Sequence, residues 1–98
     1  MSNDQAGKPW TFVTNHTQVL LTIARDSDVR MRDVAAIVGI TERAAQSIVA
    51  DLIEEGYVTR ERVGRRNHYS VNPRLKMRHP AQREQDVGPL LDVLNPPG

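Results

Sequence analysis

The sequence predicts one domain of the α+β class, mostly helical, in which three helices are followed by a β-hairpin and then by a C-terminal helix. Two patterns lead to this prediction. Apolar residues recur at helical spacing in three stretches before residue 57, and the next two stretches alternate around a glycine-containing turn. The length of 98 residues is enough for one modest hydrophobic core but not for two.

The first helix is expected from about His16 to Arg25, after an N-terminal arm formed by residues 1–13. Asn15 and Gln18 resemble a capping box, in which two side chains satisfy free N–H groups at the start of a helix. Helical spacing also predicts which side chains face the core. They are Leu20, Ile23 and Ala24, with Val19 partly buried.

A polar turn and a short segment separate this helix from the second one. The turn is Asp26–Asp28, whose short side chains bind their own backbone, and the segment Val29–Met31 is expected to be extended. The second helix is expected from about Arg32 to Val38 and is ended by Gly39. Its inward side chains are predicted to be Val34, Ala35 and Val38.

The third helix, from Thr41 to Glu55, has the clearest pattern in the chain. Thr41 is a natural N-cap, Glu42 places negative charge at the positive end of the helix dipole, and Gly56 follows as a residue expected to have positive φ. One stripe is apolar and predicts a buried face: Ala45, Ile48, Val49 and Leu52. The opposite face has a single charge and suits close contact with another surface: Arg43, Ala44, Gln46, Ser47 and Ala50.

The hairpin is expected from two β-rich strands, Tyr57–Val63 and His68–Val71, joined by a turn at Gly64–Asn67. In the first strand, alternation puts Val58 on one face together with two arginines. The hairpin as a whole has four arginines within seven residues, more than solubility requires: Arg60, Arg62, Arg65 and Arg66.

The charges are unevenly distributed, although the net charge is only +1. Residues 57–79 carry seven Lys or Arg against one Asp or Glu, a net of +6. Residues 1–56 carry five against eight, and residues 80–98 carry one against three. A concentrated basic segment in a near-neutral chain is typical of a protein that binds a polyanion.

The end of the chain, residues 73–98, is predicted to be an extended linker followed by a helix. Gly88–Pro89 falls inside the helical pattern, so the helix either starts near Pro89 or kinks there, and residues 95–98 end it. Its apolar stripe needs cover that a partner subunit can supply: Val87, Leu90, Leu91 and Leu94. The aromatic cluster of the arm packs either on the domain's own core or on a second subunit: Pro9, Trp10, Phe12 and Val13.

Several classes of protein are excluded by composition. There is no cysteine, and therefore no disulfide framework, zinc finger or thiol nucleophile. No apolar run has the length of a transmembrane helix and no signal-peptide pattern is present, so we expect a cytoplasmic protein without membrane contact. The three histidines lack ligand spacing and there is no phosphate-binding glycine loop, so we expect no metal, no cofactor and no enzymatic activity.

The order helix, short segment, helix, turn, helix, hairpin over residues 16–72 resembles the winged helix-turn-helix of MarR-like and ArsR-like bacterial transcription regulators. The residues that carry the resemblance are Arg32–Ala35, Val38–Ala44, Ile48–Leu52, Gly56–Val58 and Gly64–Asn67. It implies a DNA-binding domain over residues 14–72. The apolar stripe near the end of the chain predicts a dimerisation role for residues 73–98. The chain differs from these relatives in lacking their long flanking helices and metal-binding cysteines, so no effector is assigned.

The resemblance implies a sequence-specific transcriptional regulator that binds double-stranded DNA as a homodimer. Repression and activation both stay open, with repressor as the working expectation. The third helix would enter the major groove, with Arg43 and Gln46 as the readers of base edges. Its other expected DNA contacts are Thr41, Ala44 and Ser47. The wing and the start of the second helix would contact the minor groove or the backbone through Arg30, Arg32, Arg60, Arg62, Arg65, Arg66, Asn67 and His68. The expected dimer contacts are Trp10, Phe12, Val87, Leu90, Leu91 and Leu94.

Two other functions compete with DNA binding. Winged helices also serve as protein-docking modules, and the terminal apolar helix and the aromatic residues Trp10 and Phe12 are compatible with that use. An RNA-binding role is less well supported, because the predicted strands lack an array of aromatic side chains on which bases stack. Binding to random duplex DNA at low salt separates DNA binding from protein docking, since a pure protein adaptor shows none.

Overall fold

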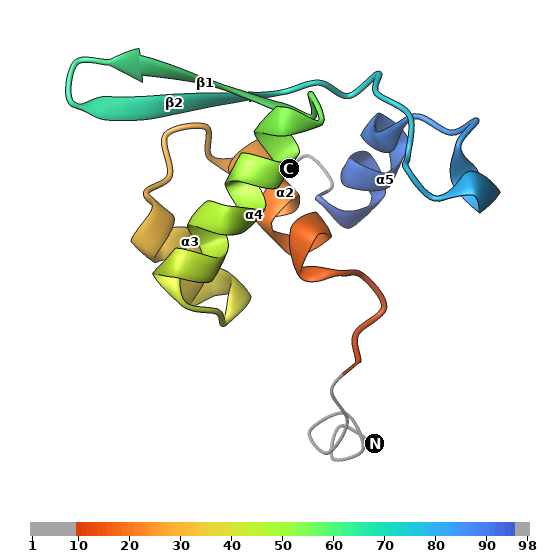
Figure 1. The fold of residues 1–98 in the computed structure, drawn as a ribbon, viewed down its shortest axis with the longest axis horizontal. Helices are drawn as coiled ribbons and strands as arrows, with labels where there is room; N and C mark the ends of the chain where they lie inside the picture. The colour runs from red at the N-terminus through yellow and green to blue at the C-terminus, as the bar shows by residue number, and fades with distance from the viewer. Residues whose placement is uncertain (1–9, 96–98) are drawn as a thin grey trace.

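The computed structural model describes residues 10–95, and it confirms a winged helix-turn-helix with a C-terminal helix (Figure 1). Residues 1–9, most of the expected arm, and residues 96–98, part of the expected helix stop, lie outside the described residues. Helices α2, α3 and α4 pack together, the hairpin extends to one side above them, and α5 lies on the other side. The elements are α2 Asn15–Arg25, α3 Met31–Val38, α4 Glu42–Glu54, β1 Val58–Val63, β2 Arg66–Val71, the 3-10 helix η1 Pro80–Gln82 and α5 Val87–Leu94.

Helix α2 begins one residue earlier than expected and has a different cap. The Thr14 hydroxyl accepts a hydrogen bond from the Thr17 amide at 3.2 Å, so Thr14 and not Asn15 is the N-cap. Its buried face is also wider than the spacing predicted, because α2 contacts α3, α4, β2 and α5. Val19 is fully buried, Leu21 is buried as well, and Ala24 is exposed, which corrects the expected positions of Val19 and Ala24.

The segment expected to be extended, Val29–Met31, forms no strand. Met31 is already the first residue of α3, and Arg30 is its N-cap residue. One backbone hydrogen bond nevertheless links the loop between α2 and α3 to the hairpin, from the Tyr69 amide to the Ser27 carbonyl at 2.8 Å. The end of α3 is as predicted: Gly39 is left-handed, with φ of 86°.

Helix α4 confirms its sequence pattern almost residue for residue. The Thr41 hydroxyl accepts from the Ala44 amide at 3.0 Å, and Gly56 has a φ of 89° just past the last turn. The predicted stripe is buried against α2 and α3, and its members are Ala45, Ile48, Val49 and Leu52. The helix-turn-helix is therefore formed by α3 and α4, joined through the turn at Gly39.

The wing, residues 58–71, is an antiparallel hairpin with a tighter turn than expected. Val63 pairs directly with Arg66, so the turn consists of Gly64 and Arg65 alone, and Arg66 and Asn67 belong to β2. Gly64 has a φ of 62°, the positive value that a two-residue hairpin turn requires at its first central position. Within the strands only Val58 and Tyr69 are buried, Val71 is half-buried against the core, and residues 59–66 are exposed.

Residues 73–88, whose first part was expected to be an extended linker without a partner, form a folded loop instead. The amides of Val87 and Gly88 donate to the carbonyls of Leu75 and Pro73, at 2.9 and 2.8 Å. These bonds satisfy N–H groups that the first turn of α5 leaves free. An ion pair between Lys76 and Asp86 at 2.7 Å closes the same loop, and Asp86 holds the pKa of Lys76 above its usual range.

Helix α5 starts at Val87, two residues before Pro89, and needs no kink because a first-turn proline lacks only an N–H that the helix does not use. Val87 and Leu91 are buried in the core of the same chain. The prediction that a partner subunit covers the whole apolar stripe is therefore wrong for these two residues, because the chain's own core covers them. Leu90 is half-buried and Leu94 is 41% exposed, so part of the stripe stays accessible.

The packing of α5 on the folded loop predicts an effect of Gly88→Ala. A methyl group at this position would lie 2.8 Å from the Pro73 carbonyl oxygen and 3.0 Å from its Cβ. We expect the free energy of unfolding to fall by about 1–3 kcal/mol, as in other overpacked sites. Helix propensity alone predicts the opposite sign, a gain of roughly 1 kcal/mol.

Urea unfolding followed by circular dichroism measures this difference. Asp92→Ala, an exposed position on the same helix, is the matched control and should change the stability by less than about 0.5 kcal/mol. An unchanged or higher stability of Gly88→Ala would show that α5 does not pack on Pro73.

Candidate nucleic-acid interface

The first two turns of α4 present an open face of small or hydrogen-bonding side chains. Arg43, Gln46 and Ser47 are exposed, and Ala44 is half-buried. Arg43 has no hydrogen-bond or ion-pair partner within the part of the chain that the structure describes, whereas the Gln46 amide lies 3.5 Å from the Glu42 carboxylate. The Thr41 hydroxyl accepts a bond as N-cap and keeps its own proton free to donate.

The other end of α4 is acidic, which limits how much of the helix can approach a polyanion. Asp51, Glu54 and Glu55 are all exposed there. Asp51 pairs with His16 at 2.9 Å and Glu55 with Arg78 at 3.7 Å, whereas Glu54 forms no ion pair among residues 10–95. These carboxylates favour the first two turns of α4 over its end for contact with a polyanion.

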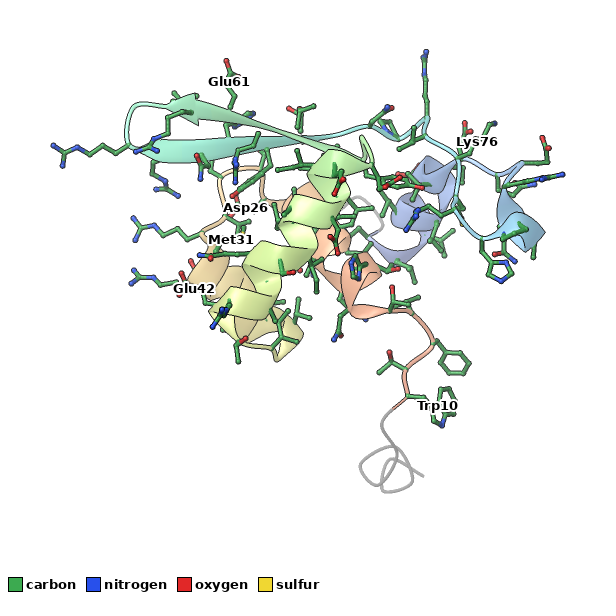
Figure 2. All side chains as sticks on the ribbon, in the orientation of Figure 1. Trp10, Asp26, Met31, Glu42, Glu61 and Lys76 are labelled. Carbon is green, nitrogen blue, oxygen red and sulfur yellow. The ribbon has the colours of Figure 1, made fainter. Side chains whose placement is uncertain are left out.

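Three wing arginines project from the hairpin without being held by the rest of the domain. Arg60, Arg62 and Arg65 are exposed, and among the described residues their one polar contact is from Arg62 Nε to the Gly64 carbonyl, 3.3 Å away in the same hairpin. Figure 2 shows long side chains with nitrogen at their ends projecting to the left, from the wing tip and from the region of Met31. Arg30 and Arg32, which flank Met31, are also exposed.

Two other residues expected to contact DNA are instead tied to the loop between α2 and α3. The Arg66 guanidinium donates from Nη2 to the Asp28 carbonyl at 2.6 Å. His68 Nδ1 lies 2.9 Å from Asp28 Oδ1, and because a carboxylate oxygen can only accept, Nδ1 carries the proton. Asn67, between them, is half-buried.

Asp28 is the residue of this region that sequence reasoning missed. The sequence pattern predicts only that Asp28 lies in a polar turn. Its hydrogen-bond partners Arg66 and His68 lie about forty positions further along the chain. No local pattern connects residues so far apart. The free charge of the wing is consequently concentrated in Arg60, Arg62 and Arg65, and Arg66 has a structural contact as well.

The aromatic pair of the arm packs on itself rather than on the core. The rings of Trp10 and Phe12 are 5.3 Å apart at an interplanar angle of 82°, an edge-to-face arrangement. Trp10 is 50% and Phe12 91% exposed, and the arm extends away from the helices (Figures 1 and 2). The aromatic cluster was expected to pack either on the domain's own core or on a second subunit. Trp10 and Phe12 do not cover the core.

A cavity of about 650 Å³ lies between the start of α2, the end of α4 and the start of α5. Its apolar lining includes Leu20, Leu52 and Leu90, and its polar lining includes the acidic residues at the end of α4. Tyr57 also lines it: burial raises the pKa of this phenol, which donates to the Lys76 carbonyl at 2.5 Å. The charged lining is mixed, because Arg78 also lines the cavity, where it pairs with Glu55.

Metal sites and membrane spans are both absent from the described residues. Within residues 10–95, no three His, Asp or Glu side chains are grouped so that they could hold a metal ion. None of the helices seen in this range is long and apolar enough to cross a membrane.

Comparison with known protein families identifies the family of this chain. A model described as the MarR family matches residues 12–66, more than half of the chain. The matched region runs from the arm through α2, α3 and α4 to the first residue of β2, and so contains the helix-turn-helix and the turn of the wing. No curated protein matches the chain.

Proposed function

The chain belongs to the MarR family of DNA-binding transcription regulators, and from this premise we propose that it recognises specific double-stranded DNA sequences as a homodimer. The observation that carries the proposal is the open face on the first two turns of α4, which lies in the same domain as a wing with unheld arginines. Helix faces that approach DNA need small or hydrogen-bonding side chains, and wings need cations.

The start of α4 supplies sequence readout in this proposal. The Arg43 guanidinium pairs with guanine O6 and N7, and the Gln46 amide with adenine N6 and N7. Gln46 must first leave its weak contact with Glu42. Thr41 and Ser47 donate to phosphate or base, and Ala44 lets the helix approach closely.

The wing and the start of α3 supply affinity that does not depend on sequence. Arg60, Arg62 and Arg65 neutralise phosphates or enter the minor groove next to the helix, and Arg30 and Arg32 add backbone contacts. Phosphate contacts fix the register of the protein on the duplex, and base contacts then select the sequence.

Pairing of two chains multiplies the small footprint of one winged helix, because each half-site then binds at a high effective concentration. The apolar surface available for pairing comprises Trp10, Phe12 and the exposed part of the α5 stripe, Leu90 and Leu94. We place the protein in the cytoplasm and expect it to repress by occupying its site on DNA. No effector is assigned.

A protein-docking module is the second candidate function, and the exposed Trp10–Phe12 pair favours it. Exposed aromatic side chains are enriched at protein interfaces. The two functions differ in one simple property. A DNA-binding regulator binds random duplexes at low salt and loses that binding as salt rises, whereas a docking module does not bind them at all.

Replacement of Arg43 tests the assigned base reader. Arg43→Ala should weaken binding to the preferred sequence by about 1–3 kcal/mol and remove the preference at one base position. Arg43→Lys keeps the charge but lacks the two-pronged geometry, so it should recover affinity for random duplexes and not the base preference. Selection from a random duplex library, followed by fluorescence anisotropy, measures both quantities. An unchanged selected sequence with Arg43→Ala would contradict the assignment.

Replacement of two wing arginines tests the source of affinity. Arg62→Ala combined with Arg65→Ala should weaken binding to all sequences alike and reduce the slope of log K against log salt by roughly 0.9 for each phosphate that is no longer neutralised. Titrations at several salt concentrations give the slope. Arg83→Ala removes a charge after η1, away from the wing, and serves as the matched control. Equal slopes for the wing variant and the control would exclude the wing from the interface.

A further inference from the structure

The loop between α2 and α3 holds the outer edge of the wing through three hydrogen bonds. The Tyr69 amide donates to the Ser27 carbonyl at 2.8 Å, and Arg66 donates to the Asp28 carbonyl at 2.6 Å. The third bond joins the side chains of His68 and Asp28 at 2.9 Å. All three lie on β2, whose other edge pairs with β1, and Figure 1 shows the loop reaching up to the hairpin at this place.

The wing needs this support because little else fixes its direction. Two-stranded hairpins are marginally stable on their own in water. Here Val58 and Tyr69 are buried in the core and Val71 packs against it, but every residue from Thr59 to Arg66 is exposed. The free arginines Arg62 and Arg65 lie in this exposed part. Their position relative to α4 therefore depends on how firmly β2 is held at its edge.

Asp28 is itself held rigidly. Its amide donates to the Asp26 carboxylate at 3.1 Å, and the next amide, that of Val29, donates to the Asp26 carbonyl at 3.2 Å. Asp26 is the C-cap residue of α2 and Arg30 is the N-cap residue of α3. The connection between two helices that pack on α4 is therefore short, and a contact with Asp28 is a contact with the helix-turn-helix frame.

We propose that Asp28 is a positioning residue for DNA binding, which fixes the wing relative to α4 through His68 and the neighbouring bonds to β2. The inference rests on the proposed function. It gives Asp28 a role in DNA binding that its negative charge alone would not predict. Asp28 is an acid beside a surface proposed to bind a polyanion, so electrostatics alone predicts that its removal strengthens binding. Positioning predicts the opposite sign, because a loosened wing no longer keeps its arginines aligned with the phosphates.

Three single variants separate these two effects. Asp28→Ala removes both the charge and the bond to His68, whereas Asp28→Asn removes the charge but keeps an oxygen that accepts from His68 Nδ1. Glu61→Gln removes a wing carboxylate that has no ion pair among the described residues and points away from the helices (Figure 2). It is the matched control for charge, since Glu61 is the cross-strand partner of His68.

Anisotropy titrations with a labelled random-sequence duplex at low salt give the first readout. Asp28→Ala should bind roughly three- to tenfold more weakly than the unaltered protein, the range of one net hydrogen bond. Asp28→Asn should restore most of the affinity, and Glu61→Gln should bind equally or more tightly. His68→Ala should match Asp28→Ala, and combining the two should cause little further loss.

Amide hydrogen exchange without DNA gives the second readout, independent of the proposed function. The Tyr69 amide should exchange about tenfold faster in Asp28→Ala than in the unaltered protein, with the amides of α4 unchanged. Binding by Asp28→Ala that equals or exceeds that of the unaltered protein overturns the positioning role, as does unchanged exchange at Tyr69. If the unaltered protein binds no duplex, the proposed function fails, and faster exchange at Tyr69 then still establishes the contact that holds the wing.

Discussion

Burial of the apolar stripe on α4 is the interaction on which the other surfaces of this protein depend. Ala45, Ile48, Val49 and Leu52 are buried against α2 and α3, and each large side chain contributes about 1.5–3 kcal/mol when fully buried. Fixing one side of the helix also fixes the direction of the other. Arg43, Gln46 and Ser47 therefore face solvent, and the wing follows directly after the helix through Gly56.

The exposed charges of α4 differ between its start and its end. The start of α4, the start of α3 and the wing carry exposed arginines, whereas the end of α4 carries Asp51, Glu54 and Glu55 around an apolar cavity. This distribution supports a division of labour in which the wing supplies most of the affinity and the first turns of α4 supply specificity.

Local signals predicted the fold well, and contacts between distant residues were what they missed. Thr41 and Gly56 were identified correctly because caps and left-handed glycines act within one helical turn. The bonds from Asp28 to β2 and from Gly88 to Pro73 join residues too far apart for any periodicity to reveal. The candidate interface shows the same difference between local and distant signals. Helical spacing predicted the open face of α4. It could not predict that Arg66 and His68 bind Asp28 in the loop between α2 and α3.

The first turns of α4 and the wing are proposed to bind duplex DNA together, and the other assignments depend on this. Chemical-shift mapping of the backbone amides, with a random-sequence duplex titrated at low salt, tests it most directly. The largest changes are expected at residues 41–47 and 60–66, and they should disappear together as salt is raised. Changes concentrated around the cavity and α5, or no changes in the presence of DNA, would contradict it.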